Sequence, residues 1–398
     1  MLFAARTLRM FGAGIMSVVL VLFLVATGFT PGATGFLITG GLAASALLTL
    51  RITTMADKIG RRRALLISLL PAVVSAVVLA VVHNSTAVGC AIVLGFVPPA
   101  SKEVGPFQAL EQAALASHAT GTERTRLFAL YNMAGMLAAA LGALAAGGIS
   151  LLDHAPRHAV APGFHPILLV YMATVVLETA AYLFVSPGIE PTQGESHGRS
   201  AVGRDGLSSS RNTVMILSVL FAMDSFGGGL VLQSYISYWF HLKYGASIPV
   251  VGSILFGANL LAGFSALGAA AIAKRIGLVN TMVFTHIPSN VLLMLIPLMP
   301  NLPLAIVVLL LRFSISQMDV PTRQSFLMAA VKPEERSAAA GITGVARTAG
   351  AAAAPSLAGM LLAAYGPAAV PFLVAGTIKI TYDLLLLGRF GRTQTIER

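Results

Sequence analysis

Three charged residues interrupt one apolar segment of the sequence, "LLLRFSISQMDVPTRQSF" at 309–326. They are Arg312, Asp319 and Arg323, in a chain of which only 10% of the residues are charged. At 100° per residue the three side chains fall on one face of a helix. A charge at the centre of a lipid bilayer costs at least about 2.5 kcal/mol on insertion scales, so such residues are candidates for binding ions, protons or a polar solute.

Asp224 is a carboxylate in a second apolar segment. At 1.5 Å per residue, Asp224 would lie about 16 Å and Arg312 about 15 Å into their segments, near the middle of a hydrocarbon core about 30 Å thick. Their similar depth predicts that they form a pair. Arg347 would lie about 15 Å into its own segment, where it could face the same cavity or bind anionic groups.

Two roles for Asp224 remain open. If it stays paired with Arg312, the two charges neutralise each other and are structural. If the pair separates in a dry cavity, Asp224 can take up a proton, as a proton-coupled antiporter requires. We favour the second role.

A cluster of glycines follows Asp224 directly. Gly227, Gly228 and Gly229 weaken the helix and predict a break, where backbone dipoles would meet a substrate. Gln233 extends this polar stretch, and it is therefore a further candidate for contact with substrate.

The composition shows which elements must hold these residues. The chain has 398 residues and is 56% hydrophobic. Only 10% of its residues are charged, whereas a soluble domain carries about 25% charged residues. Apolar runs of about 20 residues, the length of a membrane-spanning helix, recur throughout, and they are too long and too irregular for barrel strands. Twelve spans are predicted at 10–30, 33–55, 64–82, 86–112, 126–150, 164–186, 213–238, 247–273, 278–299, 302–326, 337–363 and 367–388.

The distribution of Lys and Arg predicts the orientation of these spans. With a cytoplasmic N-terminus, the inner segments hold eighteen of the 26 basic residues, and the outer loops hold only Arg157 and Lys243. Basic residues favour the cytoplasmic side, so both termini are predicted to lie inside. This placement explains the formal net charge of +11 without a nucleic-acid partner.

Residues 187–212 form one long polar stretch that predicts a flexible linker between an N-terminal six-helix bundle, 1–186, and a C-terminal one, 213–398. The halves also repeat, because 123–147 aligns without gaps on 335–359 with seven of the 25 positions identical. The triplets "KIG" at 58–60 and "RIG" at 275–277 follow the second span of each half. Parallel repeats of this kind predict a binding site between the halves.

The loop after the second predicted span reads "TTMADKIGRRRALL", 53–66. It resembles the signature loop of the major facilitator superfamily, with Thr53 in place of a glycine and Met55 in place of a leucine. The resemblance implies twelve transmembrane helices in two pseudo-symmetric six-helix bundles. It also implies that this loop latches the cytoplasmic ends of the two halves, through Asp57, Gly60, Arg61 and Arg62.

The family resemblance extends to 12-helix proton-coupled drug and solute antiporters. Many exporters of the family carry clustered glycines around Gly-Pro in the fifth span. Here that span offers Gly135, Gly142, Gly147 and Gly148, with Ala143 in place of the proline. The pattern leans toward export, and close helix packing through small residues explains it equally well.

The fourth and tenth spans suggest an inner gate. Lys102 and Asp319 reach similar depth in the two halves, and Glu103 or Glu111 could bind Arg323. These bridges would form when the protein faces outward and break when it faces inward. The alternative is a pair within one helix between Asp319 and Arg323, which are four residues apart.

Three further charged residues lie in the sixth and twelfth spans. Lys379 and Asp383 are four residues apart and are predicted to neutralise each other. Glu178 has no partner that the sequence predicts.

These patterns predict a secondary transporter that moves a small molecule by alternating access, by proton-coupled efflux. The alternative is uptake or exchange of an anionic solute through the intramembrane Arg and Lys residues. The sequence contains no H-E-x-x-H, G-x-S-x-G or P-loop pattern, so none of these motifs predicts an enzyme. We expect a monomeric multi-pass protein of the plasma membrane, of the bacterial inner membrane in particular, with protons, a small molecule and lipid as partners and with no metal, cofactor or nucleic acid.

Overall fold

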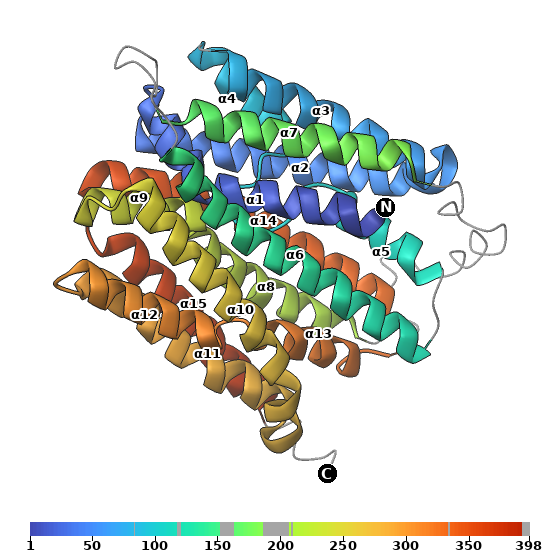
Figure 1. Cartoon of the computed structure of the whole chain (residues 1–398). Coiled ribbons are helices and arrows are strands. Elements are labelled where there is room, and N and C mark those ends of the chain that lie inside the picture. The colour runs from blue at the N-terminus through green and yellow to red at the C-terminus, as the bar shows by residue number, and fades with distance from the viewer. Residues whose placement is uncertain are drawn as a thin grey trace. The chain divides into compact units, whose positions relative to one another are not determined.

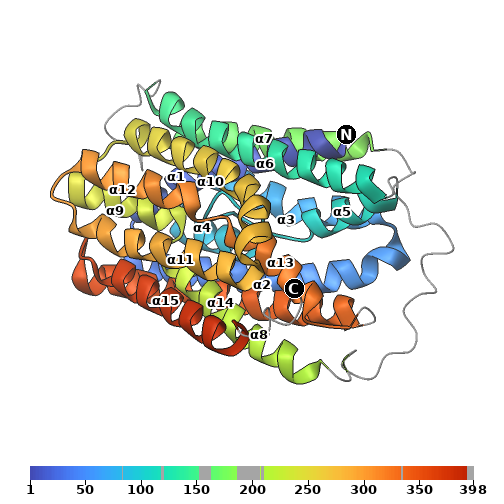
Figure 2. The same cartoon turned by 90° about the horizontal axis from the view of Figure 1, so that it is seen from below.

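The computed structural model describes residues 1–82, 84–117, 121–151, 163–185, 207, 210–332 and 335–391. Throughout these residues the regular elements are helices (Figures 1 and 2). The predicted linker at 187–212 lies almost wholly outside the described residues.

The helices follow the predicted spans closely at most boundaries. They are α1 (Leu2–Ala26), α2 (Pro31–Ile59), α3 (Arg61–Val81), α4 (Ser85–Leu94), α5 (Phe107–Ser117), α6 (Gly121–Ser150), α7 (His165–Leu183), α8 (Arg211–Leu230), α9 (Gln233–Tyr244), α10 (Ile248–Ile276), α11 (Leu278–Leu295), the short 3-10 helix η3 (Ile296–Leu298), α12 (Leu302–Ile315), α13 (Asp319–Ala329), α14 (Arg336–Tyr365) and α15 (Val370–Phe390).

Eleven helical segments among the described residues are long and apolar enough to cross a membrane. The remaining predicted span, 86–112, is interrupted: α4 is a short apolar helix, and irregular chain at 95–106 separates it from α5. Prolines in this stretch lack the backbone N–H that a helix requires. Phe96, with φ 55°, and Gly105, with φ 98°, adopt left-handed backbone conformations there. Pro98, Pro99 and Pro106 predict a disturbed helix in this span, and the structure shows a full interruption between α4 and α5.

The seventh span is also interrupted, but not where the glycines predicted. Gly227, Gly228 and Gly229 are helical within α8, and the break falls after Leu230. A Cβ at Gly227 would lie 2.7 Å from Cγ of Lys379, and one at Gly229 would lie 2.7 Å from Cβ of Ala354. Close approach of α14 and α15 thus explains these two glycines, and the predicted break at Gly227, Gly228 and Gly229 is wrong.

The described helices form two compact units, residues 1–199 with 232–259, and residues 200–231 with 260–398. In the first unit α1 packs against α6, α7 and α9 (Figure 1). In the second unit α8 packs against α14 and α15, and α11 packs against α12, α13 and α15 (Figure 2). The division into six-helix halves at 1–186 and 213–398 stays a prediction.

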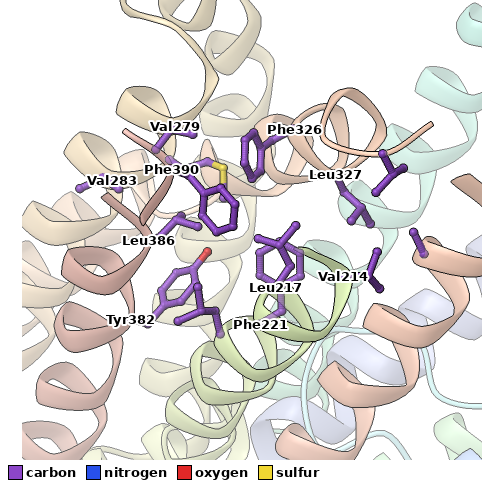
Figure 3. Packing of buried hydrophobic residues seen from close by; sticks show 14 residues of the cluster. Val214, Leu217, Phe221, Val279, Val283, Phe326, Leu327, Tyr382, Leu386 and Phe390 are labelled. Carbon is purple, nitrogen blue, oxygen red and sulfur yellow. The ribbon is translucent and has the colours of Figure 1, made fainter. Parts of the chain in front are cut away.

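The core of the second unit gathers side chains from five helices, α8, α11, α13, α14 and α15. Figure 3 labels Val214, Leu217 and Phe221 of α8, Val279 and Val283 of α11, Phe326 and Leu327 of α13, and Tyr382, Leu386 and Phe390 of α15. Aromatic rings contact one another here, with 5.5 Å between the ring centroids of Phe326 and Phe390. This apolar cluster fixes the helices that carry the charged residues of the unit.

The triplets "KIG" at 58–60 and "RIG" at 275–277 each end in a tight turn, and the two turns have similar geometry. Gly60 joins α2 to α3 with φ 93°, and Gly277 joins α10 to α11 with φ 87°. Residues that carry a side chain rarely adopt such φ values, so glycine is the residue that permits both turns. The shared geometry supports the internal repeat that the sequence indicates.

Candidate functional site

Arg9 of α1 is the centre of a buried charge network in the first unit. Its guanidinium group binds three carboxylates, with Nε 2.7 Å from Glu103 Oε1, Nη2 2.5 Å from Glu111 Oε2 and Nη1 2.7 Å from Glu178 Oε1. Three elements supply these acids: the irregular segment before α5, α5 itself and α7. Glu178, which had no predicted partner, is therefore an ion-pair partner of Arg9.

Arg6 and two tyrosines complete this network. Arg6 pairs with Glu103, and its Nε donates to the backbone oxygen of Tyr131 at 2.9 Å. The hydroxyls of Tyr131 and Tyr182 both donate to Glu111, the latter at 2.5 Å. Because each buried acid has charged or hydroxyl partners, the network satisfies the need to pair charges away from water.

A pocket with about 410 Å³ of empty space, part of it open to solvent, adjoins this network. Its charged lining residues are Arg9, Lys102, Glu103 and Glu178. Phe96 and Phe107 add aromatic surface. The pocket therefore offers charges of both signs beside apolar walls.

Asp224 of α8 is the centre of the matching network in the second unit. Its Oδ2 accepts from Arg323 Nη1 at 2.8 Å, and its Oδ1 accepts from Lys379 Nζ at 2.5 Å. The predicted pair of Asp224 with Arg312 is wrong, because Arg323 takes that place. The depth count assumed one straight tenth helix, whereas α12 ends at Ile315 and α13 begins at Asp319. Side chains of a helix also lean toward its N-terminus, which brings a long arginine side chain back along the span.

His286 of α11 lies between two buried aspartates. Its Nδ1 is 2.8 Å from Asp383 Oδ1, and its Nε2 is 3.6 Å from Asp224 Oδ1. Asn290 Nδ2 donates to Asp383 Oδ2 at 3.2 Å. The prediction that Lys379 and Asp383 neutralise each other is therefore wrong, since Lys379 binds Asp224 and Asp383 binds His286.

The proposed gate residues have partners within their own units. Glu103 and Glu111 bind Arg9, while Arg323 binds Asp224 and lies 3.5 Å from Asp319 within α13. The pair within one helix, which was the alternative, is thus present. Bridges from Lys102 to Asp319, and from Glu103 or Glu111 to Arg323, would join different units and stay predictions.

Arg312 of α12 and Arg347 of α14 stand apart from both networks. Both side chains are partly exposed, and the Nε of each is buried without a hydrogen-bond partner. The Arg312 guanidinium carbon lies 4.9 Å from the ring centroid of Phe313. Both arginines are within electrostatic range of Asp224.

Gln233, a predicted substrate residue, belongs to a ring of polar groups in the first unit. Its Oε1 accepts from the Ser101 backbone N–H at 2.7 Å, and its Nε2 donates to Asn259 Oδ1 at 2.6 Å. Asn259 Nδ2 closes the ring by donating to Ser101 Oγ at 2.9 Å. The Gln233 amide is thus hydrogen-bonded to residues of the segment before α5 and of α10.

The predicted latch is described only in part. Gly60 forms the tight turn, Arg61 is buried, and Arg62 Nη2 donates to the backbone oxygen of Leu183 at 2.6 Å. The side chain of Asp57 lies outside the described residues. The latching role of this loop stays a prediction.

Six basic or acidic members of the networks were not predicted as site residues: Arg6, Arg9, Glu178, His286, Lys379 and Asp383. Arg6 and Arg9 were among the eighteen basic residues assigned to the inner segments. One signal was available for the acids, since Glu178 and Asp383 each lie twelve residues after a proline at the start of their helices, Pro166 and Pro371. That shared position suggests equivalent roles.

Helices that are long and apolar enough to cross a membrane, with charge networks buried in both units, define a polytopic membrane protein. Residues 2–318 match the family model described as Major Facilitator Superfamily. The chain belongs to the major facilitator superfamily, a family of transporters and not of enzymes.

One curated relative covers nearly the whole chain. The "Uncharacterized membrane protein YJR124C" of Saccharomyces cerevisiae is 27% identical over 420 residues, which covers 98% of this chain and 93% of the relative. This relative is a yeast protein, so it does not support the predicted bacterial inner membrane. The chain is a multi-pass membrane protein.

Solved structures share the fold. The nucleoside transporter NupG matches with a TM-score of 0.75 at 14% identity over 98% of both chains. A D-xylose-proton symporter matches with a TM-score of 0.72 at 13% identity, over 97% of this chain and 95% of that one. The human organic anion transporter MFSD10 matches with a TM-score of 0.63 at 17% identity, over 97% of this chain and 98% of that one. The family and fold together make this protein a secondary transporter of small molecules.

Proposed function

We propose that transport by this protein is coupled to protons and that the coupling site is the network around Asp224, His286 and Asp383. The observation that carries the proposal is the position of His286, with one ring nitrogen 2.8 Å from Asp383 and the other 3.6 Å from Asp224. Histidine changes charge near neutral pH, so it is suited to accept and release a proton.

Proton uptake here would change the ion pairs that hold the helices together. Asp224 joins α8 to α13 through Arg323 and to α15 through Lys379. A proton on Asp224 would remove the negative charge that both cations share, and a proton on His286 would add a third positive charge beside it. Either event weakens or redistributes contacts among three helices, which is how protonation could bias a conformational equilibrium.

Export is the proposed direction, with a monomer in the plasma membrane and both termini in the cytoplasm. The basic residues of the inner segments support this orientation. The glycines of α6 are weaker support for export, because helix packing also explains one of them. A Cβ at Gly142 would lie 2.0 Å from the backbone oxygen of Phe11. Gly142 is therefore also required for packing. Uptake or exchange is the alternative mode.

The experiment is a substrate screen with the full chain in proteoliposomes under a pH gradient of either sign. We expect accumulation of the transported compound to reverse when the gradient reverses. His286→Gln should abolish the response to the gradient and retain counterflow exchange. His241→Gln is the matched control, because the His241 ring is hydrogen-bonded to the Ala246 backbone oxygen, at 3.1 Å, and to no acidic residue among the described residues. If transport by the unaltered protein did not depend on the pH gradient, proton coupling would be ruled out and exchange would be favoured.

A further inference from the structure

Arg312 and Arg347 are two arginines in the interior of the second unit's spans that the buried network does not use. Asp224, His286, Asp319, Arg323, Lys379 and Asp383 each have an ionic partner within that network. Among the described residues, neither Arg312 nor Arg347 has an acidic partner, and the buried Nε of each makes no hydrogen bond. A cation within a membrane span that lacks an acidic partner is unfavourable, and a functional role is its usual explanation.

We propose that Arg312 and Arg347 recognise a carboxylate or phosphate group of the transported molecule. The inference rests on the transporter function and does not depend on proton coupling. It names the chemical class of the substrate, a small molecule that carries an oxyanion.

The charges of the second unit agree with this assignment. The charged residues in the interior of its spans are three carboxylates, Asp224, Asp319 and Asp383, and four cations, Arg312, Arg323, Arg347 and Lys379. Arg323 and Lys379 bind Asp224 directly, at 2.8 and 2.5 Å, so the negative charge of Asp224 is already compensated. These seven residues together carry one positive charge in excess, which a bound anion would balance.

The geometry of arginine fits an oxyanion better than it fits a neutral solute. A guanidinium group presents five N–H donors in a planar fork, which matches two oxygens of a carboxylate or phosphate. Both arginine side chains are partly exposed, so part of each remains open to a ligand. The Arg312 guanidinium carbon lies over the Phe313 ring, 4.9 Å from its centroid, so the ring contacts a face of the planar group and not its N–H edge.

The test measures ligand-induced thermal stabilisation of the full-length purified protein in detergent, without a pH gradient. The probes are benzoate and phenyl phosphate, with neutral benzamide and cationic benzylamine as matched compounds. We expect one or both anions to stabilise the protein, and the relative effect of the two identifies carboxylate or phosphate as the preferred group. Arg312→Gln and Arg347→Gln should each weaken that binding by about tenfold or more, as loss of a charge-assisted hydrogen bond predicts.

Arg275→Gln is the matched control variant, because Arg275 is exposed at the end of α10 and the substitution removes the same charge. Equal binding of benzamide and benzoate, no binding of either anion to the unaltered protein, or unchanged binding in both Gln variants would overturn the proposal. The thermal stability of the ligand-free variants gives a second readout. Arg312→Gln and Arg347→Gln should not lower it, whereas Arg323→Gln should, because Arg323 is paired. A loss in all three variants would assign all three arginines to structure.

Discussion

Arg9 and Asp224 occupy equivalent positions in the two repeats and carry opposite charges. Each lies five residues before a glycine, Gly14 or Gly229, that packs against a backbone oxygen of the neighbouring helix. Those oxygens belong to Ala139 and Ala351, which are paired in the sequence repeat; a Cβ at Gly14 would lie 2.0 Å from the first, and one at Gly229 would lie 2.8 Å from the second.

The partners of these two residues are inverted in charge as well. Arg9 binds acids from the fourth and sixth spans, including Glu111 and Glu178, while Asp224 binds cations from the tenth and twelfth spans, Arg323 and Lys379. One helical scaffold therefore carries a cation-centred network in the first unit and an anion-centred network in the second. The two networks are expected to respond differently to the same substitution chemistry.

Asp224→Asn separates the structural role of this carboxylate from its proposed coupling role. The substitution leaves Arg323 and Lys379 without their shared anion, and removing one partner of a buried pair costs about 3–5 kcal/mol. We expect a lower unfolding temperature and no response of transport to the pH gradient. In Asp224→Asn/Lys379→Gln, stability should partly recover and coupling should not. A normal pH-gradient response in the single variant would contradict the coupling role.

Arg9→Gln should strongly destabilise the first unit, because Glu103, Glu111 and Glu178 then lose their common cation. The expected loss is about 3–5 kcal/mol, measured as the unfolding temperature of the purified protein. Adding Glu178→Gln should restore part of it. Arg63→Gln, at an exposed arginine, is the control and should change stability little. Equal effects of the two arginine substitutions would contradict the network.

Gly14→Ala and Gly229→Ala test the helix packing that aligns the two repeats. Both new methyl groups would overlap atoms of the neighbouring helix, α6 or α14, and overpacking costs about 1–3 kcal/mol. We expect lower folded yield and a lower unfolding temperature for each. Gly148→Ala, where a Cβ meets no atom within 4 Å, serves as the control. Tolerance of both packing substitutions would argue against close approach at these positions.

Gly60→Ala and Gly277→Ala test the two turns. With φ 93° and ψ 138° at Gly60, and φ 87° and ψ 166° at Gly277, an alanine would occupy a backbone region that is essentially restricted to glycine, at a cost of about 1–3 kcal/mol. Thermal unfolding should show comparable losses for the two variants. Gly388→Ala, within α15 and without a nearby atom, should be neutral or stabilising because alanine favours helices. Unequal losses at Gly60 and Gly277 would show that the turns are not equivalent.

Much of the fold could be predicted from residue types in order along the chain. Apolar runs gave the spans, and Gly60 marked the turn in the family signature. The prolines at 98, 99 and 106 indicated a disturbed fourth span, although the full interruption at 95–106 was not expected. The glycines at 227–229 were predicted to break the helix, but they allow close packing instead. A run of glycines in a sequence is compatible with either role, because glycine both lowers helix propensity and permits close approach of helices.

The sequence by itself determined that this protein spans a membrane, that its halves repeat, and that charges such as Asp224 and Arg312 lie within the spans. Those properties depend on local hydrophobicity and spacing, which need no information about neighbouring helices. Only the tertiary structure decided the pairing, Asp224 with Arg323 and Lys379 and Glu178 with Arg9. Ion pairs between helices depend on where each helix breaks, how it packs and which way its long side chains extend, and a count of depth along straight helices contains none of these.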